Sequence, residues 1–202
     1  MNREEAMSVV ARAREGAAVV MGPGASCGLL YEKADDPATI YNMDMGYATA
    51  IALGVALACP DRRVFAIEGE GSFYAGSTVL SAIWRMQPKN LVVVVLDNGV
   101  WGTGDGLEPT ATACGVDLAG LAVAAGWSPD RVQHATEASE FDRRLSAATA
   151  TGGPQFIVGK TDPKLDAHLS SGSTRPRPGR HLLDCAVLMR NELAREARGA
   201  RD

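Results

Sequence analysis

The stretch 66–106, AIEGEGSFYAGSTVLSAIWRMQPKNLVVVVLDNGVWGTGDG, decides the fold of this 202-residue chain. It begins inside an apolar run that stops at GEGS (69–72). A segment with helical spacing follows over 75–86, and the fully apolar run 91–96 then stops at DNG (97–99). A strand, a glycine turn, a helix, a second strand and a polar turn together form one βαβ unit.

The two turns of this unit carry the oxygen-bearing side chains of Glu70 and Asn98. In a right-handed crossover both turns lie at the carboxyl ends of parallel strands, where open α/β sheets bind their ligands. Hard oxygen donors are the ligands that Mg²⁺ prefers, and a glycine backbone with a hydroxyl lies beside them. The pattern therefore predicts a site for Mg²⁺ carrying a diphosphate.

Strands and helices alternate along the rest of the chain, which predicts an α/β fold: a doubly wound parallel sheet with helices on both faces. We expect a single domain over 1–202, in which a polar loop (161–180) and a C-terminal helix (181–198) form an appendage. Residues 107–115 are also expected to be a loop. The helices are expected over 3–15, 47–59, 75–86, 117–125, 137–150 and 181–198, and the strands over 17–21, 40–41, 64–67, 91–96, 132–134 and 154–159.

The composition is that of an ordinary globular protein, with 46% apolar residues, 22% charged residues and a net charge of −4. This charge gives no reason to expect binding to nucleic acid or to an anionic membrane surface. The four cysteines show no CxxC spacing, so we expect thiols rather than a zinc site. The N-terminus is unlike a signal peptide, and no apolar run reaches the ~18 residues of a membrane span. We therefore expect a cytoplasmic protein.

A glycine-rich turn near the N-terminus, Gly22-Pro23-Gly24 with Gly28 beyond it, invites comparison with a nicotinamide or flavin fingerprint. That fingerprint requires its third glycine at position 27, where Cys27 stands, and Pro23 lies inside the turn. A simple strand-to-helix turn is the preferred interpretation.

The three histidines, His134, His168 and His181, are interpreted as structural or solvated, with His168 the best candidate for an active-site role. The arginines of the late loop, Arg175, Arg177 and Arg180, are interpreted as a solvated run. The alternative is a lid that attracts an anionic substrate.

The combination of GEGS with Asn98, which follows Glu70 by 98 − 70 = 28 residues, resembles the thiamine-diphosphate motif, Gly-Asp-Gly followed after a few tens of residues by Asn-Asn. Further segments agree in order: MDMGYATAIALGVALA (43–58), PKNLVVVVLDNGVWGTGDG (88–106), PTATACGVDLAGLAVAAG (109–126) and GPQFIV (153–158). The chain resembles the family of thiamine-diphosphate-dependent enzymes over about residues 1–161. Within the family it is similar to the diphosphate-binding (beta) subunit of sulfopyruvate decarboxylase and to the matching part of phosphonopyruvate decarboxylase.

The resemblance implies thiamine diphosphate and Mg²⁺ as cofactors and assigns a site. Met45 would lie beneath the cofactor, the Met43 carbonyl would accept from its pyrimidine amino group, and Gly71 and Ser72 would donate to the diphosphate. The metal ligands implied are Glu70, Asn98 and the Val100 carbonyl, and the cofactor contacts are Met43, Asp44, Met45, Gly69, Gly71, Ser72, Asn98, Val100, Trp101 and Gly102.

Three positions depart from the family pattern. Glu70 replaces the usual aspartate, and one extra methylene moves the carboxylate relative to a metal that demands near-ideal octahedral geometry. Asp97 replaces the first asparagine, a change we regard as harmless because Asn98 is kept. Asp44 stands where serine is usual, and its carboxylate could repel an anionic substrate or tune a proton transfer.

The function that the resemblance implies is one subunit of a decarboxylase acting on a 2-oxo acid such as sulfopyruvate or phosphonopyruvate. The glutamate that activates the cofactor is expected on a separate pyrimidine-binding subunit, in a heterodimer or heterotetramer, so no catalytic residue is assigned to this chain. The small-residue helix 47–59 is a candidate contact surface. A carboligase subunit and a non-catalytic cofactor-binding scaffold remain as alternatives.

Overall fold

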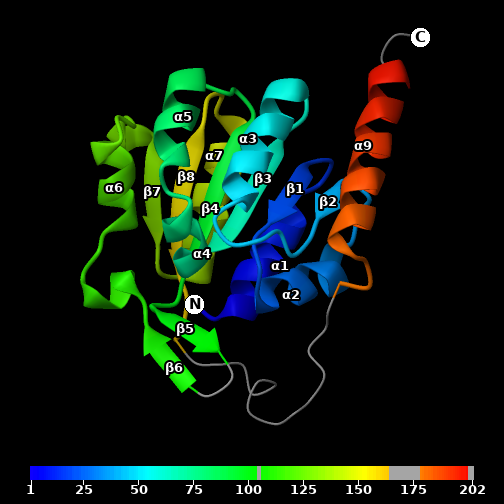
Figure 1. Ribbon diagram of the computed structural model, residues 1–202. Coiled ribbons are helices and arrows are strands. Elements are labelled where there is room, and N and C mark those ends of the chain that lie inside the picture. Colours follow the sequence, from blue (N-terminus) through cyan, green and yellow to red (C-terminus); the bar gives the residue numbers. More distant parts are fainter. Residues whose placement is uncertain (104–105, 164–177, 200–202) are drawn as a thin grey trace.

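A computed structural model describes residues 1–103, 106–163 and 178–199. Its centre is a six-stranded sheet, every pair of which is parallel, in the order β2-β1-β3-β4-β8-β7 (Figure 1). The strands are β1 (Ala18–Met21), β2 (Thr39–Ile40), β3 (Val64–Gly69), β4 (Leu91–Asp97), β7 (Val132–Ala135) and β8 (Gln155–Lys160).

Helices cover both faces of this sheet, so the predicted doubly wound α/β fold is confirmed (Figure 1). One face carries α3 (Ala48–Ala58), α4 (Glu70–Ala75), α5 (Val79–Met86) and α6 (Leu118–Ala124), and the other carries α1 (Arg3–Ala13), α2 (Ala25–Ala34) and α7 (Ala138–Ala150). All seven residues of β4 are buried, as expected for a parallel strand covered on both sides.

The crossover helix expected over 75–86 is present and ends at Met86 as expected, but it begins later than expected, and a second, short helix precedes it. Helix α4 begins at Glu70, inside the GEGS turn, and α5 begins only at Val79. The break lies at Gly76, where a Cβ atom would overlap the carbonyl oxygen of Gly46. This close backbone contact comes from a distant part of the chain, so no local periodicity could predict it.

The segment 107–115, expected as a loop, also contains regular structure. Strand β5 (Val100–Thr103) pairs antiparallel with β6 (Gly106–Pro109), and a short 3₁₀ helix, η1 (Ala111–Cys114), follows. The ribbon of β5 and β6 lies beyond the carboxyl ends of the sheet strands (Figure 1). A two-stranded ribbon outside the main sheet carries no long apolar pattern, which is why the sequence did not predict it.

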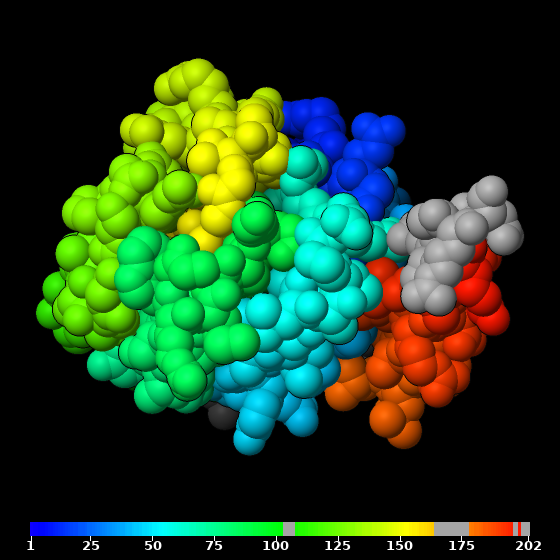
Figure 2. All heavy atoms as spheres, turned by 90° about the horizontal axis from the view of Figure 1, so that it is seen from above, coloured from blue at the N-terminus to red at the C-terminus, as the bar shows by residue number. Residues whose placement is uncertain are grey.

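Helix α9 (Leu182–Gly199) lies at the edge of the sheet beside β2, at the opposite side of the molecule from α6 (Figures 1 and 2). Cys185 and Met189 bury their side chains in the main core. Arg180, just before the helix, forms an ion pair with Asp35 and lies 5.7 Å from the ring centre of Tyr31. Arg180 is thus anchored to the body of the protein, whereas Arg175, Arg177 and His168 lie outside the described residues.

Candidate functional site

The two predicted ligand turns meet at one edge of the sheet. Strands β3 and β4 are neighbours, with Gly69 opposite Leu96, so Glu70 and Asn98 both follow strand ends directly. The backbone N–H of Asn98 donates to Glu70 Oε2 at 3.4 Å. The predicted meeting of the two turns at the carboxyl ends of parallel strands is confirmed.

A cavity of about 360 Å³ opens at this edge. Of the residues predicted from the sequence, it is lined by Met45, Gly69, Glu70, Gly71, Ser72, Asn98, Val100, Trp101 and Gly102. Met43 and Asp44 are not part of the lining; they lie in the turn before α3, where the Met43 N–H donates to the Met21 carbonyl at 2.9 Å.

Glu70 is a buried carboxylate with 4% of its surface exposed. Its Oε1 accepts from the Thr110 hydroxyl at 2.9 Å. Burial raises the pKa of Glu70, and the nearby charge of Asp97 raises it further, against the opposing hydrogen bonds from Thr110 and Asn98. A divalent cation beside this carboxylate would offset the cost of its buried charge.

The side chain of Asn98 turns back on its own backbone. Its Oδ1 accepts from the Val100 N–H at 3.2 Å, which shapes the turn between β4 and β5. An amide oxygen has two lone pairs, so one remains for a further partner.

Asp97 serves a different purpose from its neighbour. Its carboxylate accepts from the Gly99 N–H (3.0 Å), from the Thr112 hydroxyl (2.7 Å) and from the Lys160 ammonium. Asp97 therefore ties the end of β4 to η1 and β8.

Glu68 is a site residue that the sequence analysis missed. It is 2% exposed and lines the cavity, and its Oε1 accepts from the backbone N–H (2.8 Å) and hydroxyl (2.7 Å) of Thr49. Its Oε2 accepts from the Ser72 hydroxyl, which in turn accepts from the Gly46 N–H at 3.2 Å. The signal was a charged residue inside the apolar run VFAIEG. Glu68 joins the first turn of α3 to the GEGS turn.

The turn between β1 and α2 is the second part of the cavity that the sequence analysis missed. The turn consists of Gly22, Pro23 and Gly24 and joins a strand to a helix, as the sequence analysis expected in preference to a dinucleotide fingerprint. It faces the GEGS segment across the cavity. A Cβ atom on Gly22 would lie 3.1 Å from both Glu68 Cγ and Ser72 Oγ, so a side chain there would press on both.

The two described histidines lie outside the cavity. His134 Nε2 is 3.6 Å from an oxygen of Asp117, on an exposed part of β7. His181 Nδ1 accepts from the Leu183 N–H at 3.4 Å, at the start of α9. Both histidines therefore make contacts at the protein surface, as expected for structural or solvated side chains.

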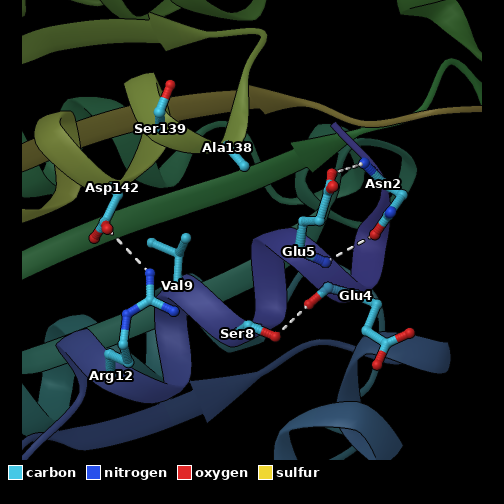
Figure 3. A pocket seen from close by; sticks show the side chains of 9 residues that line it. All are labelled: Asn2, Glu4, Glu5, Ser8, Val9, Arg12, Ala138, Ser139 and Asp142. Carbon is cyan, nitrogen blue, oxygen red and sulfur yellow. Dashed lines mark hydrogen bonds and ion pairs between the residues drawn. The ribbon is translucent and has the colours of Figure 1, made fainter.

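A second hollow, of about 430 Å³, lies between α1 and α7 (Figure 3). Its polar side chains already have partners within the two helices. Asn2 and Glu5 form a reciprocal cap at the start of α1, with two hydrogen bonds of 2.8 Å, and Arg12 of α1 forms an ion pair of 3.0 Å with Asp142 of α7. These contacts stabilise the two helices. The cavity at the strand ends is therefore the candidate functional site.

The fold and this site define a cofactor-binding α/β domain, and comparison with known proteins gives its family. Residues 31–158 match the family model described as thiamine pyrophosphate enzyme, C-terminal TPP binding domain. The chain belongs to this family of thiamine-diphosphate-dependent enzymes.

Two named relatives are similar over most of the chain. Phosphonopyruvate decarboxylase of Streptomyces viridochromogenes is 37% identical over 143 residues, which cover 70% of this chain and 34% of that protein. Sulfopyruvate decarboxylase subunit beta of Methanocaldococcus jannaschii is 32% identical over 135 residues, or 66% of this chain and 69% of the subunit. The chain thus spans about a third of the first relative and most of the second.

Among solved structures, a putative thiamin diphosphate-dependent enzyme from Mycobacterium smegmatis superposes with a TM-score of 0.70 at 25% identity. The match covers 81% of this chain and 32% of that enzyme. The doubly wound fold is therefore that of thiamine-diphosphate-dependent enzymes.

Proposed function

We propose that this chain is the diphosphate- and Mg²⁺-binding subunit of a thiamine-diphosphate-dependent 2-oxo-acid decarboxylase. The observation that carries the proposal is the buried Glu70 carboxylate beside Asn98, at the ends of adjacent parallel strands and in the wall of a cavity. The two relatives support the reaction class, because both are named as decarboxylases of substituted pyruvates.

The residues present fit a magnesium diphosphate. Within the described part of the chain, no three His, Cys, Asp or Glu side chains gather into a metal cluster. The proposed ligand set needs none, since one carboxylate, one amide and one carbonyl leave room for phosphate oxygens, as Mg²⁺ sites usually do. At Gly69 an added Cβ would meet nothing within 4 Å, so the backbone is open to the cavity.

Each side of the cavity then has a task. Glu70, Asn98 and the Val100 carbonyl would hold the ion, the backbone of Gly71 and Ser72 would donate to the diphosphate, and Met45 would support the organic part of the cofactor. When bound, thiamine diphosphate supplies the nucleophilic carbon and the electron sink needed for loss of CO₂ from a 2-oxo acid. The Ser72 hydroxyl is already bound to Glu68, so its backbone N–H is the group left for phosphate.

The catalytic partner would be a pyrimidine-binding subunit that covers this cavity. Exposed apolar side chains on and near α3 support such an interface: Tyr47 (61% exposed), Ile51, Leu57 and Tyr74. Tyr47, Ile51 and the exposed Gly54 follow one another at helical spacing, so they share one face of α3. A relative of which this chain covers 69% is itself named as a beta subunit.

The test is reconstitution. With a pyrimidine-binding subunit, the wild-type chain is expected to release CO₂ and an aldehyde from sulfopyruvate or phosphonopyruvate, and calorimetry is expected to show Mg²⁺-dependent binding of thiamine diphosphate that Glu70→Ala loses. A new carbon–carbon bond among the products would instead make the enzyme a carboligase. Activity without any partner would contradict the two-subunit proposal, and no cofactor binding with the partner present would support a scaffold.

A further inference from the structure

Glu70 is held by a residue outside the family motif. We propose that Thr110, whose backbone N–H is held by the Gly99 carbonyl, is the positioning residue that orients the Glu70 carboxylate toward the metal ion. This inference rests on the proposed function and explains how the chain tolerates glutamate where its family has aspartate.

The geometry assigns different tasks to the two carboxylate oxygens of Glu70. Oε1 accepts from Thr110 Oγ1 at 2.9 Å, whereas Oε2 lies on the side of Asn98, 3.4 Å from its backbone nitrogen. The Thr110 backbone is fixed as well, because its N–H donates to the Gly99 carbonyl at 2.9 Å. With Oε1 occupied by Thr110, Oε2 is the oxygen left beside the second ligand turn.

The hydroxyls of Thr110 and Thr112 each point at a different carboxylate. Thr112 Oγ1 lies 3.2 Å from Thr110 Oγ1 and donates to Asp97 Oδ1 at 2.7 Å. A hydroxyl has one proton and an ionised carboxylate only accepts, so Thr112 donates to Asp97 and Thr110 donates to Glu70, and no proton is left to lie between the two threonines. The Lys160 ammonium on the other oxygen of Asp97 offsets the charge of this buried carboxylate.

A glutamate needs such support more than an aspartate does. The extra methylene adds one rotatable bond, so the carboxylate of a free glutamate samples more orientations and loses more entropy when fixed. Thr110 restricts this freedom before the metal arrives. A shorter carboxylate at position 70 would withdraw from Thr110, so the substitution Glu70→Asp should make the threonine dispensable.

The experiment is a double-mutant cycle on the full chain, read as Mn²⁺ affinity in the presence of thiamine diphosphate by electron paramagnetic resonance. Thr110→Val is expected to weaken Mn²⁺ binding about tenfold or more, the usual cost of losing a group that orients a metal ligand. Thr110→Ser should restore most of the affinity. In the Glu70→Asp background Thr110→Val should change it less than about twofold, since the contact is already lost.

The matched control is Thr151→Val, because the Thr151 hydroxyl donates to the Ala147 carbonyl at the end of α7, away from the cavity. It should leave Mn²⁺ affinity unchanged. If Thr110→Val fails to fold by circular dichroism, Thr110→Ala, which removes the same hydroxyl, serves as the second variant and should weaken binding in the Glu70 background only.

Two failures can be told apart. The positioning role alone is overturned if the wild-type chain binds metal and cofactor but Thr110→Val does not weaken Mn²⁺ binding. It is also overturned if Thr110→Val weakens Mn²⁺ binding by the same factor in the wild-type and Glu70→Asp backgrounds. A wild-type chain that binds neither overturns the proposed function and this inference together.

Discussion

The backbones of Gly46 and Gly76 cross so closely that a Cβ atom on Gly76 would overlap the carbonyl oxygen of Gly46. The crossing brings the turn before α3 against the end of α4, thirty positions along the chain. It thereby sets Met45 beside the GEGS segment in the cavity wall.

The first prediction concerns this crossing. Gly76→Ala is expected to destabilise the protein by roughly 3 kcal/mol, the upper end of the usual cost of adding a methyl group to a packed site. The cost is high because the added Cβ would meet backbone atoms of Gly46, which cannot rotate away as a side chain can. Urea unfolding followed by circular dichroism would measure this. The control is Gly54→Ala on the exposed side of α3, where an added Cβ meets nothing; it should stabilise by about 0.5–1 kcal/mol. Equal effects of the two substitutions would contradict the close contact.

The second prediction is a pH dependence from Glu70, whose pKa is raised above its ordinary value of 4.5 by burial. The folded state holds this proton more tightly than the unfolded state, so the linked stability is fully present below 4.5. It is lost as the pH rises through the raised pKa. Without metal, Glu70→Gln should therefore gain stability relative to wild type as pH rises above 4.5. A constant difference between the two proteins from pH 4 to pH 8 would exclude this linkage.

The third prediction concerns thiol reactivity. Burial raises the pKa of Cys27 to about 12, and its Sγ donates to the Gly22 carbonyl at 3.0 Å. The thiolate is the reactive form, so Cys27 should resist alkylation in the folded protein, whereas exposed Cys114 should react readily. Mass spectrometry after a short iodoacetamide pulse would distinguish them. Labelling of Cys27 as fast as Cys114 would show that this core is open.

The fourth prediction tests how α9 is anchored. Arg180→Ala removes the ion pair with Asp35 and the stacking on Tyr31, so the first turns of α9 should exchange their amide protons several-fold faster. Hydrogen exchange with mass spectrometry would locate the change. Arg190→Ala, on the exposed side of the same helix, is the matched control and should leave exchange near Cys185 unchanged. Equal exchange in both variants would mean that the buried residues alone hold the helix.

Much of the fold could be predicted because the chain repeats one simple pattern. Apolar runs such as Leu91–Leu96 are buried on both sides, and glycine or polar turns follow them, so strands, their parallel pairing and the ligand edge could all be inferred locally. The break at Gly76 and the ribbon of β5 and β6 could not, because both depend on contacts between distant segments.

The candidate site divides in the same way. Glu70 and Asn98 were predicted because each follows a strand directly, and their meeting requires only that the two strands be neighbours. Thr110 and Glu68 were missed because their partners, Glu70 and Thr49, lie far along the chain. Glu68 at least gave a signal, a charge within a buried strand, whereas a threonine in a polar segment gives none.

Helix α9 lies against β2, which is only two residues long and forms one edge of the sheet. Edge strands expose unpaired backbone groups that can recruit a strand from another molecule, and covering them is one way in which proteins avoid this. A chain shortened before His181 would uncover this edge together with the pocket left by Cys185 and Met189. The C-terminal helix therefore covers an edge strand that would otherwise be open to pairing with another molecule, at a place separate from the cavity at the carboxyl ends of the strands.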